Sequence, residues 1–234
     1  ETLLDVVRDP RLMNRLTFEC VKCYGVDGLR AWMPPDPLDV VQVDDNWYGR
    51  DPQTGAVLGR VDFQGGGGVL PAEAPSLETL EDIAAIPEPT VEEIQRSGKL
   101  EGIKAILDEA GDDYFVISCP GAFTVEEITF VRGKMQALVD LYDRPAFCHA
   151  LLEKAYRNAV NHAKALIDLG IHGLMIADTY GGVVHPDHFA AFCQDYWTRW
   201  VREIRAYRPD VIIYLHICGH SSHLFELMAD TGVI

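Results

Sequence analysis

Four runs of mainly apolar residues predict buried β-strands at 27–33, 114–119, 172–178 and 211–217. They lack the alternation of apolar and polar positions that marks a strand with one solvated face. Longer segments with apolar residues at helical spacing separate the runs, so strands and helices alternate along the chain. This order predicts an α/β fold in which helices cover a parallel sheet.

The helical segments are bounded by proline, glycine or small polar residues. They cover residues 10–24, 75–87, 90–111, 124–142, 145–169, 186–207 and 221–232. Ser76 is the expected N-cap of the second segment, with Thr79 at the position of a capping-box glutamate. Near 39–63, two β-rich runs flank the turn residues RDPQTG, which predicts an inserted β-hairpin. No linker interrupts the chain, so we expect a single domain over 1–234.

Composition narrows the classes of partner. The net charge of -16 would repel phosphate backbones, so we expect neither nucleic acid nor an anionic membrane surface as a partner. No apolar run approaches the roughly 20 residues of a membrane helix, and the acidic start lacks the regions of a signal peptide. The six cysteines are too thinly spread for a disulfide framework, which predicts a reducing, cytoplasmic compartment.

Chemistry-bearing residues stand at the carboxyl ends of the predicted strands, where ligands bind in parallel α/β folds. These residues are Arg30 and Trp32, Cys119, Asp178 and Tyr180 with His185 nearby, and His216 and Cys218. Arg30, Trp32 and His185 are candidates for substrate binding. Asp178 and Tyr180 are candidates for catalysis, although Asp178 could instead cap the turn DTYGG and Tyr180 could fill its loop.

His216 and Cys218 are two positions apart in a strand, so their side chains point to the same face. Imidazole nitrogen and thiolate sulfur are ligands that suit zinc. The alternative is a cysteine packed as a small apolar residue beside a histidine bonded to a carbonyl. The C-x-x-C pair Cys20 and Cys23 falls within a helix before any strand, which favours two thiols on a helix face over a redox or zinc site.

The second half of the chain resembles the uroporphyrinogen decarboxylase superfamily, which includes corrinoid-dependent methyltransferases. VISCPGAFT is similar to the family's Gly-x-Pro-Phe/Trp-Thr segment after a strand. LVDLYDRPAFCHALLEKAYRNAVNHAKALIDLGIHGLMIADTYGG is similar to the helices and the Asp-bearing strand that follow, and HPDHFAAFCQDYWTRWVREIRA to the next helix. Residues 1–35 resemble the family's second barrel strand and the helix before it more weakly.

The resemblance implies a (β/α)8 TIM barrel, of which the four predicted strands would be strands two to five. Half a barrel has unpaired strand edges. We therefore expect either a longer native chain or another copy of the protein, as in a homo-oligomer, to cover them.

The resemblance also separates two branches of the superfamily. Its decarboxylases carry an Arg-rich N-terminal motif and an aspartate after the second strand, where this chain reads LRAWMPP. Its methyltransferases carry His-x-Cys and a distant cysteine as zinc ligands, and His216-Ile217-Cys218 fits the pair. The third ligand would lie beyond residue 234, with Cys119 as the alternative.

The resemblance favours a zinc-dependent methyltransferase that moves a methyl group between a corrinoid (cobalamin) on a partner protein and a thiol or methoxylated small molecule. The first alternative is a metal-free decarboxylase of a tetrapyrrole, as in porphyrin biosynthesis. The second alternative is a non-catalytic binding protein of the same fold.

Overall fold

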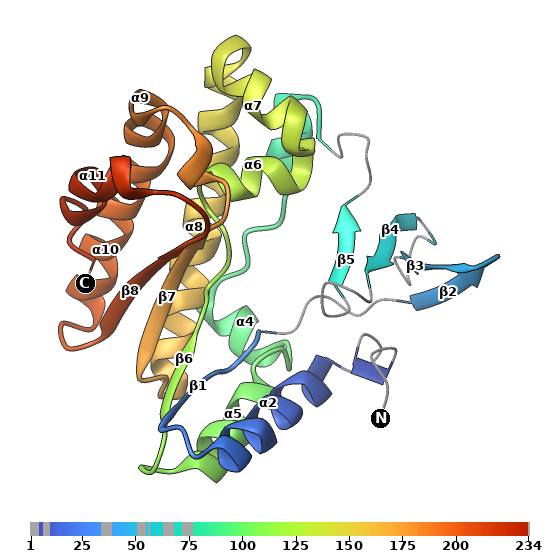
Figure 1. Cartoon of the computed structure of the whole chain (residues 1–234), viewed down its shortest axis with the longest axis vertical. Coiled ribbons are helices and arrows are strands. Elements are labelled where there is room, and N and C mark those ends of the chain that lie inside the picture. Colours follow the sequence, from blue (N-terminus) through green and yellow to red (C-terminus); the bar gives the residue numbers. More distant parts are fainter. Residues whose placement is uncertain are drawn as a thin grey trace.

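Four parallel strands form the sheet around which the chain is built (Figure 1). The computed structural model describes residues 5–6, 10–33, 39–50, 55, 57–62, 68–71 and 77–233. The strands are β1 (Gly28–Arg30), β6 (Phe115–Ser118), β7 (Gly173–Asp178) and β8 (Ile212–Ile217), in the spatial order β1-β6-β7-β8. All three neighbouring pairs are parallel, which confirms the predicted α/β class and the four predicted strands.

Helices fill the connections between these strands. They are α2 (Pro10–Tyr24), α3 (Leu80–Ala85), α4 (Val91–Arg96), α5 (Glu101–Ala110), α6 (Val125–Arg132), α7 (Lys134–Asp143), α8 (Pro145–Leu169), α9 (Pro186–Phe189), α10 (Asp195–Tyr207) and α11 (Phe225–Ala229). Three single-turn elements accompany them: η1 (Gly181–Val183), η2 (Ala190–Gln194) and η3 (Ser222–Leu224). No helix of the described residues is long and apolar enough to cross a membrane.

Two helix predictions are corrected. The helix expected over 124–142 divides into α6 and α7 at Gly133. Gly133 has a φ of 73°, a conformation that glycine adopts with little steric penalty. The N-cap expected at Ser76 lies outside the described residues. The described cap of α3 is Thr79, which forms a reciprocal capping box with Asp82.

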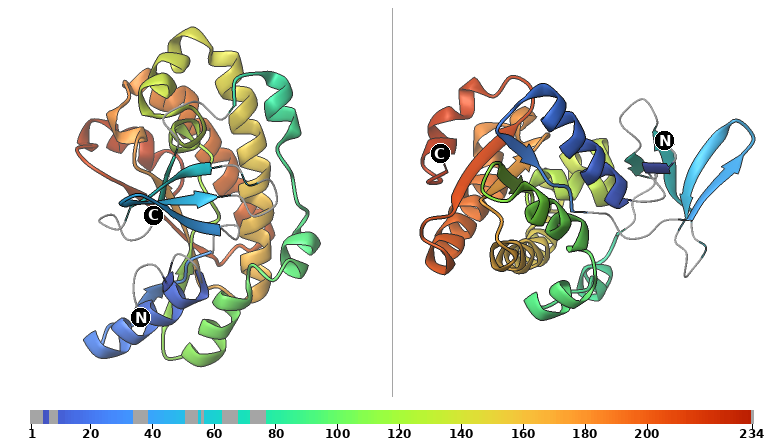
Figure 2. Two further views of the ribbon diagram at one scale, coloured as in Figure 1. Left: turned by 90° about the vertical axis from the view of Figure 1, so that its right-hand side faces the viewer. Right: turned by 90° about the horizontal axis from the view of Figure 1, so that it is seen from below.

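The insertion is larger than the predicted hairpin at 39–63. It is an antiparallel sheet of β2 (Asp39–Val43), β3 (Asn46–Arg50), β4 (Val57–Asp62) and β5 (Gly68–Pro71), paired in that order. The additional turn between β2 and β3 contains Asp44, with a φ of 52°. Aspartate tolerates this left-handed conformation better than most residues, so a polar pair inside a β-rich run can reverse the chain. The small sheet stands apart from the parallel sheet (Figures 1 and 2).

Helices α8 and α10 pack against the parallel sheet and enclose most of the core (Figures 1 and 2). Trp197 and Trp200 of α10 are both fully buried, and so is Leu151 of α8. Burying an aromatic side chain removes on the order of 150–250 Å² from water, so this layer contributes much of the hydrophobic stabilisation.

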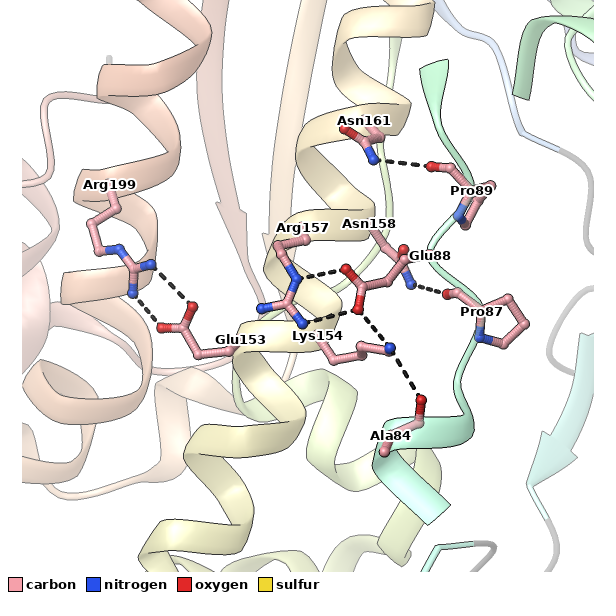
Figure 3. Close-up of polar contacts among 10 residues, drawn as sticks. All are labelled: Ala84, Pro87, Glu88, Pro89, Glu153, Lys154, Arg157, Asn158, Asn161 and Arg199. Carbon is pink, nitrogen blue, oxygen red and sulfur yellow. Dashed lines mark hydrogen bonds and ion pairs between the residues drawn. The ribbon is translucent and has the colours of Figure 1, made fainter. Parts of the chain in front are cut away.

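The connection between α3 and α4 is fastened along α8 by polar contacts (Figure 3). The contacts join Glu88 to Arg157 and Lys154, Pro87 O to Asn158, and Pro89 O to Asn161. Hydrogen bonds from Arg157 and, to a smaller extent, from Lys154 lower the pKa of Glu88 to about 2. On the other side of α8, Glu153 pairs with Arg199 of α10 (Figure 3). The outer helices are therefore tied together by ion pairs as well as by the core.

The pleat divides the parallel sheet into two faces. Leu29, Val116, Leu174 and Ile213 point toward the helices and are at most 5% exposed. The register aligns Arg30, Ile117, Gly173 and Ile212 on the opposite side, which we call the open face. Ile212 is 46% exposed there, although it lies in the middle of an apolar run. Within the described residues, helices cover one face of the sheet, and β1 and β8 each keep one unpaired edge.

Candidate functional site

His216 lies on the open face near the carboxyl end of β8, and Cys218 follows that strand directly. His216 Nε2 is 3.2 Å from Cys218 Sγ, so the two side chains meet on one side of the sheet. His216 is exposed and Cys218 is half-buried, which leaves both accessible to a ligand. The hydroxyl of Thr179, from the end of β7, lies 3.8 Å from the same sulfur. The two side chains predicted to bind a metal therefore lie side by side, and metal binding itself stays a prediction.

A third ligand is not found beside this pair. Among the described residues, no three His, Cys, Asp or Glu side chains form a group that could hold a metal ion, so Cys119 does not complete one. Burial raises the pKa of the Cys119 thiol. The rings of His220 and His223, both exposed on the segment after β8, stack with their centres 6.1 Å apart.

Asp178 ends β7 but points away from the open face, because its register partner in β8 is Ile217 rather than His216. The carboxylate is fully buried. It accepts from the Thr124 hydroxyl at 2.6 Å and from the backbone N–H groups of Gly181, Tyr180 and Glu126 at 2.6, 2.9 and 3.2 Å. The Cys193 thiol donates to the same carboxylate at 3.8 Å. Burial raises the pKa of Asp178, and the hydroxyl and N–H donors act against that rise. Asp178 therefore makes the turn-capping contacts and ties the segment after β6 to the segment after β7.

Tyr180 and His185 lie on the segment after β7 and have structural contacts. Tyr180 packs against the core, and the Lys134 ammonium lies 5.3 Å from the centre of its ring. His185 is the N-cap of α9, where its Nδ1 accepts from the backbone N–H of Asp187 at 3.3 Å. Roles for Tyr180 in catalysis and for His185 in substrate binding stay predictions.

Arg30 and Trp32 occupy the carboxyl end of β1, as predicted. The Arg30 guanidinium carbon lies 3.8 Å from the centre of the Trp32 ring. Trp32 keeps 41% of its surface exposed. The arginine is therefore stacked on an aromatic side chain beside the open face, and the pair could contact a substrate there.

Two carboxyl groups that sequence reasoning missed stand in the first turn of α6. Burial and the charge of Asp178 raise the pKa of Glu126, and bonds from the Thr179 hydroxyl and N–H lower it. Burial, with a smaller effect of Glu126, raises the pKa of Glu127 to about 7. Acidic residues are common at helix N-termini, so the pair did not stand out. The sequence signal that could have identified this pair was its place in the segment that follows a predicted strand end.

Replacing Glu127 by Gln is expected to flatten the pH dependence of stability. The pKa of Glu127 rises from 4.5 to about 7 on folding, so the folded state binds more protons between these pH values. The contribution of Glu127 to stability is therefore fully present below pH 4.5 and is lost as pH rises to about 7. The uncharged glutamine side chain loses nothing in this window, so the variant should be more stable than the wild type at pH 8 by about 1–3 kcal/mol.

Urea unfolding at pH 5 and pH 8 measures this difference in the free energy of unfolding. Exposed Glu226, replaced by Gln, is the control and should change stability by less than about 0.5 kcal/mol at both pH values. Parallel wild-type and Glu127→Gln profiles would show that Glu127 keeps an ordinary pKa.

Gly182 brings the segment after β7 against the end of β8. A Cβ atom at position 182 would lie 3.0 Å from the Cys218 carbonyl oxygen, which is tighter than nine in ten real Cβ contacts. The absence of a side chain thus lets η1 approach the backbone of Cys218 closely.

Comparisons with known proteins agree on the family. The model of the family described as "Uroporphyrinogen decarboxylase (URO-D)" matches residues 56–234. The chain is 24% identical to a uroporphyrinogen decarboxylase of Nautilia profundicola over 172 residues, which are 71% of this chain and 50% of the relative. It is 26% identical to that of Corynebacterium glutamicum over 238 residues, covering 99% of this chain and 60% of the relative.

A solved structure shares the fold. A methyltransferase from Methanosarcina mazei superposes with a TM-score of 0.68 at 19% identity, covering 99% of this chain and 65% of that chain. The chain spans about half to three fifths of the length of the curated relatives that it matches. The fold is of the TIM-barrel type, with four of the parallel strands in the described residues. Because the family model matches more than half of the sequence, the chain belongs to the uroporphyrinogen decarboxylase family.

Proposed function

We propose that the protein is a zinc-dependent methyltransferase that moves a methyl group between a corrinoid carried by a partner protein and a thiol or methoxylated small molecule. The observation that carries this proposal is the pair His216 and Cys218, whose nitrogen and sulfur meet at 3.2 Å on the open face. The family relationship and the methyltransferase fold of the Methanosarcina mazei protein support it.

The two side chains fit a zinc ion. Zinc–nitrogen and zinc–sulfur distances of about 2.0 and 2.3 Å in a tetrahedral site place the two donor atoms about 3.5 Å apart. The observed separation of 3.2 Å needs a movement of only a few tenths of an ångström. A catalytic zinc site requires three protein ligands and an open position, and we assign the third ligand to residues beyond Ile234.

The roles of the chain's own residues follow from their places. Zinc bound there would act as a Lewis acid that lowers the pKa of a thiol substrate. His216 and Cys218 would hold the ion, while Arg30 and Trp32 would contact the rest of the substrate. The corrinoid of the partner protein would supply the methyl group: attack of the thiolate sulfur on the methyl carbon would break the cobalt–carbon bond and leave its electron pair on the corrinoid. Asp178 acts as a positioning residue, because its carboxylate is enclosed by backbone donors.

A metal-free decarboxylase of a tetrapyrrole is the second candidate. It is favoured by the names of the curated relatives, and Arg30 offers a positive charge for a carboxylate group. This alternative assigns no role to the His216–Cys218 pair.

Two measurements on the natural full-length protein distinguish the candidates. Elemental analysis should give about one zinc per chain, and incubation with methylcobalamin should produce a methylated thiol. A protein free of zinc that releases carbon dioxide from uroporphyrinogen would replace the proposal with the second candidate.

A further inference from the structure

Arg30 is a positive charge at the open face without a negative partner among the described residues. Its Nε atom is buried and has no hydrogen-bond partner, and no ion pair joins its guanidinium to a carboxylate in that part of the chain. A buried polar group without a partner costs free energy, and the cost is larger for a charged group. An oxyanion brought by a ligand would remove this cost through charge-assisted hydrogen bonds.

The backbone around Arg30 is held in place. Buried Asn14 of α2 donates to the Trp32 carbonyl oxygen at 2.8 Å and accepts from the Trp32 N–H at 2.6 Å. One residue earlier, the Ala31 carbonyl oxygen accepts from the Ser118 hydroxyl at 2.8 Å. The backbone of Ala31 and Trp32 is therefore anchored to a helix and to the neighbouring strand, which limits the freedom that this segment loses on binding a ligand.

Arg30 lies on the same face of the sheet as His216. The register aligns Arg30 through Ile117 and Gly173 with Ile212, which lies four residues before His216. Burial raises the pKa of Cys119 after β6 and of Glu126 in α6, and the charge of Arg30 opposes the rise in both. The Glu126 carboxyl accepts hydrogen bonds from Thr179, and no ion pair joins it to Arg30 in the described part of the chain.

We infer that Arg30, stacked on Trp32, binds a carboxylate group of the small-molecule substrate whose reacting atom lies at His216 and Cys218. The inference rests on the proposed methyl transfer and narrows its substrates to anionic ones. A guanidinium presents two parallel N–H donors that match the two oxygens of a carboxylate. A substrate with the same thiol but an uncharged amide would leave Arg30 unpaired.

The test compares 3-mercaptopropionate with 3-mercaptopropionamide, which differ only in this charge. Calorimetric titration of the natural full-length protein should show the carboxylate binding roughly 10–100-fold more tightly than the amide. In methyl transfer from methylcobalamin, the same preference should appear in KM, with kcat similar for the two thiols.

Arg30→Met should remove the preference by weakening binding of the carboxylate alone. Arg30→Lys keeps the positive charge but lacks the two parallel N–H donors of a guanidinium, so it should retain part of the preference. This variant keeps the test valid if Arg30→Met does not fold. The matched control is Arg144→Met, because Arg144 also stacks on an aromatic ring, at 4.2 Å from the centre of Phe147, but at the start of α8. The control should bind both thiols as the wild type does.

The outcomes separate this inference from the proposed function. Equal binding of the two thiols by the wild type, or a preference that survives Arg30→Met, would overturn the carboxylate site. A preference that depends on Arg30 in a protein that methylates neither thiol would uphold the site and refute the methyl transfer.

Discussion

Replacement of His216 by Ala or of Cys218 by Ser is expected to remove zinc from the full-length protein and to abolish methyl transfer. Each change deletes one of two donors that lie 3.2 Å apart, and a zinc ion left with fewer protein ligands dissociates. Loss of an outer-shell partner costs about 10–100-fold in metal affinity, and the loss of a ligand should exceed that range. Zinc content after dialysis and competition with a chelator measure the effect.

Neighbouring histidine and cysteine residues provide matched controls. His220 is exposed on the same segment, and Cys23 is exposed on α2. His220→Ala and Cys23→Ser should keep zinc and methyl transfer at the wild-type level. If His216→Ala retains zinc with unchanged affinity, the metal is bound elsewhere and the proposed site is wrong.

Replacement of Asp178 by Ala should cost about 2–5 kcal/mol of stability, because each buried donor left without an acceptor costs about 1–3 kcal/mol. The change leaves the Thr124 hydroxyl and three backbone N–H groups without an acceptor in a site that water does not reach. It also frees the segment after β6 from the segment after β7. We therefore expect reduced zinc affinity in any fraction that still folds, because Thr179 follows Asp178 directly and contacts Cys218.

Urea unfolding at pH 7 measures this effect, with exposed Asp210→Ala as the control, which should stay within about 0.5 kcal/mol of the wild type. Asp178→Asn should be intermediate, since it keeps one acceptor oxygen but turns an amide toward the N–H donors. A loss below about 1 kcal/mol in Asp178→Ala would mean that its donors find other acceptors.

The parallel sheet was predictable because buried parallel strands are apolar on both sides, and all four runs became strands. The insertion was less accessible to sequence reasoning. Its first reversal contains Asp44 in place of the glycine that usually marks a tight hairpin. Its last strand begins at Gly68, at the end of a four-glycine run that gives no sign of a strand in the sequence.

The site was only partly predictable, for a geometric reason. Sequence reasoning located the strand ends but did not fix the face to which each terminal side chain points. His216 and Cys218 are two positions apart, so their spacing alone predicted that their side chains point to the same face. The face of Asp178 depends on the register between β7 and β8, which only the structure supplies. Arg30 was found from its position, but only the structure shows that no described residue pairs with its charge and that its Nε atom is buried.

Gly182 links two parts of the sequence that have no chemistry in common. A side chain at this position would press on the Cys218 carbonyl oxygen, so η1 or the backbone after β8 would have to give by a few tenths of an ångström. The spacing of the two proposed zinc ligands therefore depends also on a residue 36 positions before Cys218 that offers no ligand of its own. What Gly182 contributes to this end of the sheet is space, and any side chain there would take part of it away.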